Sequence, residues 1–460
     1  MSFLIQNGTL ILPDGPCRAD LRLDNGIIAE IGPGLAPGSS QVLDAAGKLV
    51  FPGFIDTHTH FEMNKGLPNE TADSFATGTR AAVAGGTTCI LDFATQDRGM
   101  TLQQGLDAWH SRADGRSSCH YGFHMAITEW SDAVRAELPA MTAQGVTSYK
   151  IYMAYDALRV TDGVAYEILR AVDREGGVCG CHCENGDLVT EGIRAMKAAG
   201  HYGPEAHPRS RPPMVEAEAV DRWLAIAELA GVPVNIVHLS TLRGLEAVRA
   251  ARARGQRFYV ETCPQYLLLD EGRYGLPGFE SAKFVLSPPL RAPENCQALW
   301  QAVENGEVDT IGTDHCSFDF NGPKQLGRQD FSAIPNGIPG VEHRPALLYT
   351  TGVKTGRLTE ADMARLLSEN PARLFGMYPQ KGVLAPGSDG DIVIFDPEYT
   401  GRITAETQYQ NVDYTPYEGM ELQGRADTVL LDGQIVVQGG RVVLENQGRY
   451  VKRGPAQFWR

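Results

Sequence analysis

The segment Pro52-Gly53-Phe54-Ile55-Asp56-Thr57-His58-Thr59-His60 ends an apolar run with two histidines spaced two residues apart. Side chains at positions i and i+2 of an extended strand lie on the same face. His58 and His60 can therefore both reach one metal ion from the end of one strand. A histidine pair of this spacing also occurs as a surface or core feature, so its meaning depends on which residues end the other strands.

Short apolar strands alternate with longer amphipathic stretches from residue 52 to residue 376, which indicates a parallel α/β architecture. We expect eight strands, at residues 53–60, 89–94, 121–127, 148–153, 178–184, 234–240, 257–263 and 309–314. Eight such units predict a (β/α)8 TIM-like barrel, with an open doubly wound sheet as the alternative. No glycine-rich phosphate loop follows any of these strands, so nothing supports nucleotide binding.

The two ends of the chain differ from the middle because they are strand-like and rich in turns, for example at Asn25-Gly26 and Asp432-Gly433. We expect residues 1–51 and 377–445 to form one β-sandwich domain beside a catalytic barrel of residues 52–376. The last segment, residues 446–460, is polar and aromatic. We expect this tail either to extend over a neighbouring subunit or to fray.

The composition is that of a soluble globular protein, with 43% hydrophobic and 21% charged residues. The formal net charge of -15 argues against nucleic acid or an anionic membrane surface as a partner. No apolar run approaches the roughly 18 residues that a membrane span needs, and the N-terminus lacks the basic region of a signal peptide. The nine cysteines have no framework spacing, which indicates reduced thiols and a cytoplasmic location.

Residues that can bind metal gather at the carboxyl ends of the expected strands, where the chemistry of a β/α barrel is found. The set comprises His58, His60, Lys150, His182, His238 and Asp314. Each histidine alone is better explained as a structural residue, but the whole set predicts a metal site. Cys179, Cys181 and Cys183 alternate with His182, so we expect them to face away from it as small buried side chains.

Four imidazoles and one carboxylate exceed the ligands that one zinc ion takes, which suggests two ions about 3.5–4 Å apart. Two such ions need an anionic bridge, whereas the remaining residue, Lys150, is an ammonium without a lone pair at neutral pH. Carboxylation of the lysine amine by carbon dioxide resolves this conflict, because the carbamate is anionic and has one oxygen for each ion. The alternative is that Lys150 is an ordinary surface lysine or an ion-pair partner of Asp314.

Eight motifs along nearly the whole chain resemble those of the cyclic amidohydrolases, in particular the dihydropyrimidinase/hydantoinase branch of the amidohydrolase superfamily and its bacterial phenylhydantoinase-type members. These motifs are FIDTHTH (54–60), YK (149–150), CENGD (183–187), ETCPQYL (261–267), LSPPLR (286–291), TDHC (313–316), NGIPGVE (336–342) and NPARLFG (370–376). Together they are highly specific for this branch.

The resemblance implies a role for each matching position. His58, His60 and Asp314 would hold one zinc ion, His182 and His238 would hold the other, and carboxylated Lys150 would bridge the two. Tyr155 would stabilise the developing oxyanion, while Ser287 and Asn336 would hold the cyclic amide, largely through backbone groups. We leave His124 and His315 off the list of ligands, because their positions on the strands favour a structural role.

The expected reaction is the opening of a cyclic amide by a hydroxide that bridges the two ions. Its substrates would be 5-substituted hydantoins or dihydropyrimidines, and its products N-carbamoyl amino acids. Tyr155 would stabilise the oxyanion, and Asp314 would move a proton from the nucleophile to the ring nitrogen. No covalent intermediate is expected, because the sequence lacks a Gly-x-Ser-x-Gly elbow.

Two other functions stay open at the level of sequence. One is an allantoinase or dihydroorotase, although the TDHC and NGIPG motifs resemble the hydantoinase branch more closely. The other is a catalytically silent structural protein like the dihydropyrimidinase-related proteins of animals, which lose ligands, whereas all six ligand positions are filled here. The resemblance also implies assembly into a homotetramer or homodimer.

Substrate choice in this family depends largely on the loops after the first and fourth strands. Here these loops carry Lys65 and Arg159, where typical members have more apolar or aromatic residues. We expect these cations to favour a more polar ring substituent, with the alternative that both point into solvent.

Overall fold

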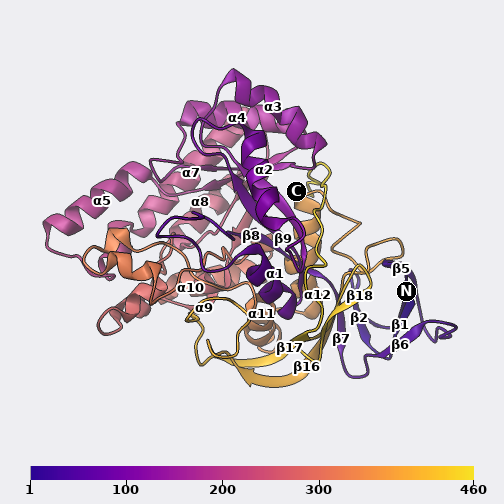
Figure 1. The fold of residues 1–460 in the computed structure, drawn as a ribbon. Coiled ribbons are helices and arrows are strands. Elements are labelled where there is room, and N and C mark those ends of the chain that lie inside the picture. Colours follow the sequence, from indigo (N-terminus) through magenta and orange to yellow (C-terminus); the bar gives the residue numbers. More distant parts are fainter. Residues whose placement is uncertain (1, 460) are drawn as a thin grey trace.

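The structure is a computed structural model that describes residues 2–459, and its centre is an eight-stranded parallel sheet rolled into a barrel (Figure 1). The strands follow one another around the sheet in sequence order. The barrel closes where the His60 amide donates to the carbonyl oxygen of His315 at 2.8 Å, which joins the first strand to the chain after the eighth. The barrel strands are β8 (Phe54–Thr59), β9 (Thr87–Thr95), β10 (His120–Ala126), β11 (Ser148–Tyr152), β12 (Val178–His182), β13 (Val234–Ile236), β14 (Phe258–Thr262) and β15 (Thr310–Ile311).

Helices follow the strands and cover the outside of the barrel, so the predicted β/α alternation is confirmed. Ser74 and Thr101 begin α1 and α2 with capping boxes that satisfy the free amides of the first turn. The helices are α1 (Phe75–Ala84), α2 (Leu102–Ala113), α3 (Asp132–Ala143), α4 (Asp162–Arg174), α5 (Gly186–Ala198), α6 (Ala206–Ser210), α7 (Pro213–Ala230), α8 (Leu242–Ala253), α9 (Pro264–Leu268), α10 (Pro293–Glu304), α11 (Arg344–Leu348), α12 (Glu360–Ala364) and α13 (Asn370–Leu374).

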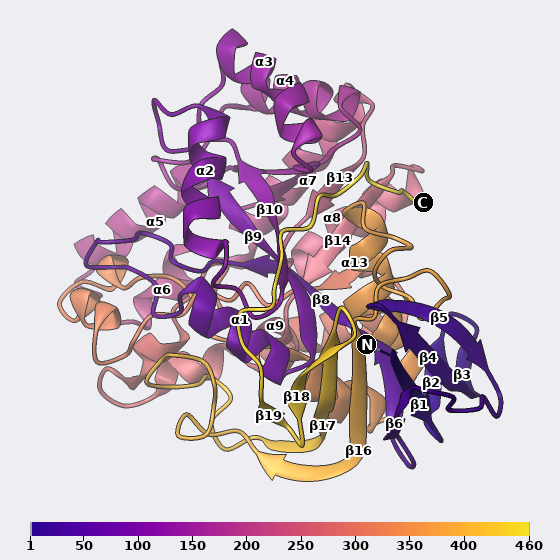
Figure 2. The same cartoon turned by 45° about the vertical axis from the view of Figure 1, so that its right-hand side comes forward.

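The two ends of the chain build two further sheets beside the barrel (Figures 1 and 2). One has the order β5 (Ile27–Gly32), β4 (Asp20–Asp24), β1 (Ser2–Gln6), β6 (Gln41–Asp44). The other has the order β19 (Arg441–Val442), β18 (Gln434–Gln438), β17 (Glu421–Leu431), β16 (Ile392–Arg402), β7 (Leu49–Pro52), β2 (Thr9–Leu12), β3 (Gly15–Arg18). Strand β7 from the N-terminal end pairs antiparallel with β16 from the C-terminal end, and apolar residues of both sheets pack together between them. The prediction that both chain ends form one sandwich is confirmed.

The sixth and eighth barrel strands are shorter than the sequence predicts. We expected them at 234–240 and 309–314, whereas β13 ends at Ile236 and β15 ends at Ile311. The reason is local, because His238 (φ 39°) and Asp314 (φ 52°) adopt left-handed backbone conformations that an extended strand cannot contain. Both residues therefore belong to the turns above the strands.

The described part of the C-terminal tail packs along its own barrel, so the expectation that residues 446–460 fray was wrong for this part, while extension over a neighbouring subunit stays a prediction. Figure 2 shows this segment, in yellow, running along the barrel. The Tyr121 amide donates to the Arg449 carbonyl oxygen at 3.1 Å, and the buried Arg453 donates to the Ser148 hydroxyl at 2.6 Å. Since Tyr121 and Ser148 lie at the amino-terminal ends of their strands, the tail covers the end of the barrel opposite the catalytic one.

Candidate active site

One pocket of about 290 Å³ opens at the carboxyl ends of the barrel strands. It is lined by all nine residues that the sequence singled out, which are His58, His60, Lys150, Tyr155, His182, His238, Ser287, Asp314 and Asn336. The rest of the wall is made by Met63, Asn64, Asn69, Tyr152, Leu158, Cys316, Phe318, Pro335 and Gly337. A larger cavity, of about 630 Å³, lies between the barrel and the C-terminal sheet, but no group of metal ligands converges there among residues 2–459. The chemistry of the lining, not the volume, therefore identifies the site.

The candidate ligands face one another inside this pocket. The Nε2 atoms of His58 and His60 each lie 3.1 Å from Oδ1 of Asp314. Nδ1 of His182 lies 3.0 Å from Nε2 of His238. Donor atoms in such positions can share a cation that takes the place of the contacts between them.

Two buried nitrogen atoms test whether this arrangement fits a metal. Nε2 of His58 and Nδ1 of His238 are buried and make no hydrogen bond within the described chain. For His58 the nearby acceptor is the Asp314 carboxylate, at 3.1 Å, which is itself a candidate metal ligand. A buried nitrogen without a partner is costly, and an ion coordinated by Nε2 of His58 would remove that cost. The residues present fit divalent metal ions.

The charge states of these groups suit metal binding. Burial lowers the pKa of His60, His182 and His238, so these imidazoles stay neutral with a free lone pair. Burial alone would raise the pKa of Asp314, but His58 and His60 hold it well below its ordinary value. Burial also opposes protonation of His58, yet Asp314 and other neighbouring carboxylates raise its pKa to about 9, so a metal ion displaces a proton there.

Carboxylates behind the histidines fix the orientation of the rings. Glu261 accepts from Nδ1 of His58 at 2.7 Å and from the Thr57 hydroxyl at 2.6 Å. Glu184 contacts Nε2 of His182 at 2.9 Å. Such partners set the tautomer of a ligating histidine and keep the other nitrogen aimed at the metal. Neither glutamate was assigned a role from the sequence, although both lie in motifs that carry the family resemblance, CENGD and ETCPQYL.

A buried arginine connects the ligand side of the pocket to the substrate side. Nη1 of Arg211 donates to Glu184 at 2.9 Å and to the Ser287 hydroxyl at 2.6 Å. The Tyr155 hydroxyl interacts with both members of the second pair, Arg211 and Ser287. Burial would raise the pKa of Glu184, but Arg211 and His182 lower it to about 2, so the carboxylate stays charged. No sequence pattern pointed to Arg211, which lies in the segment between α6 and α7.

Lys150 lies at the third position of β11, fully buried among the candidate ligands. Its amine nitrogen is 4.8 Å from the centre of the Phe93 ring. Burial lowers the pKa of Lys150, which increases the fraction of neutral amine, the form that reacts with carbon dioxide. Lys150 is therefore not a surface lysine. Its place in the site fits a group that faces both histidine pairs, His58 with His60 and His182 with His238.

Strained backbone accompanies the candidate residues. Tyr155 (φ 68°), His238 (φ 39°) and Asp314 (φ 52°) all adopt left-handed conformations that cost energy for residues with a side chain. Such strain persists only where the surrounding structure enforces it, and it is concentrated at functional sites.

Lys65 and Arg159 are not part of the pocket lining. Lys65 forms an ion pair with Glu62 at 2.5 Å, and Arg159 pairs with Asp156 at 2.9 Å and Asp187 at 2.6 Å. The expectation that these cations select a polar ring substituent was therefore wrong, because neighbouring carboxylates hold both of them.

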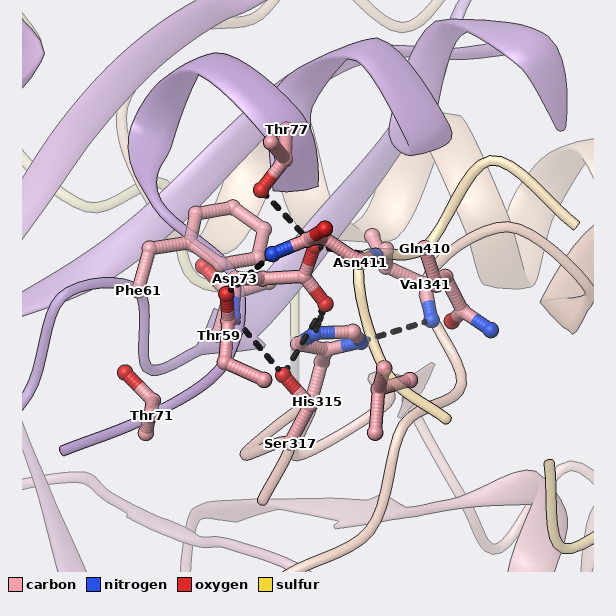
Figure 3. Close-up of polar contacts among 12 residues, drawn as sticks. Thr59, Phe61, Thr71, Asp73, Thr77, His315, Ser317, Val341, Gln410 and Asn411 are labelled. Carbon is pink, nitrogen blue, oxygen red and sulfur yellow. Dashed lines mark hydrogen bonds and ion pairs between the residues drawn. The ribbon is translucent and has the colours of Figure 1, made fainter. Parts of the chain in front are cut away.

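His315 and His124 make other contacts than those of metal ligands. Nε2 of His315 lies 3.0 Å from the buried carboxylate of Asp73, and its Nδ1 accepts from the Val341 amide at 3.2 Å (Figure 3). His124 contacts the Ser148 hydroxyl at 2.6 Å and the Thr57 carbonyl oxygen at 3.0 Å. Both rings thus use both nitrogens in hydrogen bonds.

A second group with metal-binding residue types lies at the opposite end of the barrel, where Nε2 of His120 is 3.4 Å from both Asp391 and Asp432. Two cations already neutralise these carboxylates. Lys381 pairs with Asp391, and Arg449 pairs with Asp432 at 2.9 Å. This group is a partly buried ion-pair network that joins barrel, sandwich and tail.

The chain is similar to known proteins over almost its whole length. The model of the amidohydrolase family matches residues 49–436. A D-hydantoinase of Geobacillus stearothermophilus is 43% identical over 98% of this chain and 97% of its own length. A D-phenylhydantoinase of Escherichia coli strain SE11 is 40% identical over 99% of both chains.

Solved structures give the same result. The dihydropyrimidinase of Brevibacillus agri NCHU1002 superimposes with a TM-score of 0.97 at 40% identity, covering 99% of both chains. The L-hydantoinase of Arthrobacter aurescens superimposes with a TM-score of 0.89 at 28% identity, covering 98% of this chain and 99% of its own. None of the helices in the described chain has the length and apolar character of a membrane span. This chain is a member of the amidohydrolase family and, within it, of the cyclic amidohydrolases that include the hydantoinases and dihydropyrimidinases.

Proposed function

We propose that this protein hydrolyses the cyclic amide bond of 5-substituted hydantoins or dihydropyrimidines and releases N-carbamoyl amino acids. The observation that carries this proposal is the convergence of four histidines, one aspartate and one lysine in a single pocket of a cyclic amidohydrolase. The relatives described above are named for hydantoins or dihydropyrimidines, which favours these rings over allantoin or dihydroorotate. A catalytically silent protein would not need to keep the whole set of ligands.

Two zinc ions are the proposed cofactors, with manganese as another possible metal. His58, His60 and Asp314 would hold one ion, His182 and His238 the other, and a carbamate on Lys150 would bridge them. When bound, the two ions lower the pKa of a shared water and so supply hydroxide at neutral pH.

The residues of the chain would then carry out the remaining steps. The Tyr155 hydroxyl would donate to the amide oxygen as negative charge develops on it. Ser287 and Asn336 would hold the ring in the pocket. Oδ1 of Asp314 faces the two histidines, which leaves Oδ2 free to take a proton from the attacking water and to return it to the ring nitrogen.

A turnover panel tests the proposal. Enzyme loaded with zinc is expected to open 5-phenylhydantoin, hydantoin or dihydrouracil faster than allantoin or dihydroorotate, and to lose activity when a chelator removes the metal. Both enantiomers of the substituted hydantoin belong in the panel. Activity that survives full removal of metal, or turnover of dihydroorotate alone, would contradict the proposal.

The carbamate needs a separate measurement. Protein prepared with ¹³C-labelled carbon dioxide is expected to give a carbamate carbon signal that is absent from Lys150→Met, together with a lower zinc content in the variant. An identical signal in both proteins would rule out Lys150 as its carrier.

A further inference from the structure

A fully buried lysine lies beneath the substrate side of the pocket. Lys324, in the short 3-10 helix Pro323–Gly327, has no exposed surface. Its ammonium group donates to three backbone carbonyl oxygens, those of Val285 at 2.7 Å, Pro335 at 2.8 Å and Gly337 at 2.8 Å. Buried lysines are rare and normally pair with a carboxylate. The contacts of Lys324 found in residues 2–459 are with carbonyl groups instead.

Three carbonyl oxygens match the three N–H groups of an ammonium. A neutral amine has only two, so one carbonyl oxygen would then face a lone pair. Burial lowers the pKa of Lys324 to about 7, while the three charge-assisted hydrogen bonds favour the ammonium over the neutral amine. Each of these bonds is made to a backbone carbonyl oxygen. Lys324 can therefore hold the main chain of the loops in place whatever side chains the loops carry.

The three carbonyl oxygens belong to two loops that line the pocket. Pro335 and Gly337 flank Asn336, and all three line the pocket. Val285 precedes Ser287 by two residues, and its carbonyl oxygen also accepts from the Gly337 amide at 3.0 Å. Lys324 thus ties the loop of Ser287 to the loop of Asn336.

The loops leave little room for another arrangement. A Cβ atom at Gly337 (φ 151°) would lie 2.4 Å from the carbonyl oxygen of Cys316. The ring of Phe318, which also lines the pocket, has its centre 5.8 Å from the Lys324 nitrogen. Lys324 therefore supports this wall from behind without touching the pocket.

We propose that Lys324 is a positioning residue that sets the spacing between the backbones of Ser287 and Asn336 and thereby determines how tightly the cyclic amide binds. This inference rests on the proposed function, because that function assigns the cyclic amide to these two loops. The hydrogen bonds of the Lys324 ammonium go to the two substrate loops and to none of the candidate metal ligands, so we expect its effect on substrate binding and not on metal loading.

Lys324→Met keeps the length of the side chain and removes all three hydrogen bonds. We expect KM for the hydantoin to rise by about tenfold or more, while zinc content stays that of the wild type and kcat changes by less than about threefold. Lys324→Gln retains two N–H donors, so its KM is expected to lie between those of the wild type and of Lys324→Met. The matched control is Lys381→Met, which alters another buried lysine at the far end of the barrel and should reduce stability without changing KM.

Hydrogen exchange separates this role from a general loss of stability. The amides of residues 285–287 and 335–337 are expected to exchange faster in Lys324→Met than in Lys381→Met. A KM within about twofold of wild type, or loop exchange equal to that of the control, would overturn the positioning role. Failure of the proposed function is distinguishable, because zinc-loaded wild type would then open none of the rings.

Discussion

At the scale of single residues, Arg211 connects two parts of the site that the chain brings together from distant segments. Through Glu184 it acts on the His182 ring, and through Ser287 it acts on the substrate wall. The charge on Glu184 depends on Arg211, because burial alone would raise the pKa of this carboxyl. The guanidinium of Arg211 thus helps to orient both a candidate metal ligand and the substrate wall.

Replacing Arg211 with methionine is expected to lower kcat/KM by roughly 10- to 100-fold, the range found when the partner of a ligating histidine is lost. The physical reason is that Glu184 would stay buried without its cation and would take up a proton. Steady-state kinetics on the zinc-loaded variant measures the effect. Arg159→Met, which breaks only exposed ion pairs, is the control and should keep the wild-type value. Equal kcat/KM in both variants would contradict the role of Arg211.

Sequence patterns identified the lining of the site but not its support. His58, His182 and His238 were predictable because a barrel places its chemistry where strands end. Arg211 and Lys324 were not, because each lies in an irregular segment between regular elements and resembles any other charged residue. Their function depends on burial and on partners far along the chain, which a single sequence does not show.

At the scale of elements, the ends of the strands and the course of the C-terminal tail were the hardest features to predict from the sequence. Apolar composition continues through Val237 and Gly312, beyond the last residues of β13 and β15. The tail contains few apolar residues, yet Val451 and Arg453 are buried. The tail is held in place by backbone pairing, by arginine side chains and by aromatic rings that pack on Phe123 and Tyr259, which composition does not reveal.

Removing residues 446–460 is expected to destabilise the barrel by on the order of 3 kcal/mol or more, because the buried hydrogen bonds of Arg453 and the contacts of Val451 are lost. Chemical denaturation followed by tryptophan fluorescence measures the change. Deleting only residues 458–460 is the control, since Phe458 and Trp459 are only partly buried. Indistinguishable unfolding midpoints for wild type and the longer deletion would show that the tail contributes nothing to stability.

At the scale of the whole molecule, the network of His120, Lys381, Asp391, Asp432 and Arg449 joins the three parts of the chain. Burial opposes ionisation of Asp391, but Lys381 and His120 hold its pKa below the ordinary value. A carboxyl with a depressed folded-state pKa stabilises the fold above its unfolded pKa of about 4. That contribution is lost as the pH falls below this value.

Asp391→Asn is therefore expected to reduce the free energy of unfolding at neutral pH by about 1–3 kcal/mol, because the buried Lys381 then keeps only Asp389 as its carboxylate partner. The loss of stability on acidification below about pH 4 should become shallower than in wild type. Urea titrations at several pH values measure both effects. Asp132→Asn, at a highly exposed position, should match wild type at every pH. An unchanged acid slope for Asp391→Asn would show that this carboxyl is not the source of the pH dependence.

The pairing of β7 with β16 sets a constraint on the order of synthesis. Pro52 pairs with Ile392, so about 340 residues separate the partners along the chain. At a translation rate of roughly 5–20 residues per second, β7 leaves the ribosome roughly 20 to 70 seconds before its neighbour exists. During that interval its unpaired edge can bind the equivalent strand of another nascent chain. Crowding of ribosomes on the messenger RNA, more than the stability of the finished molecule, should therefore determine how much of this protein folds correctly.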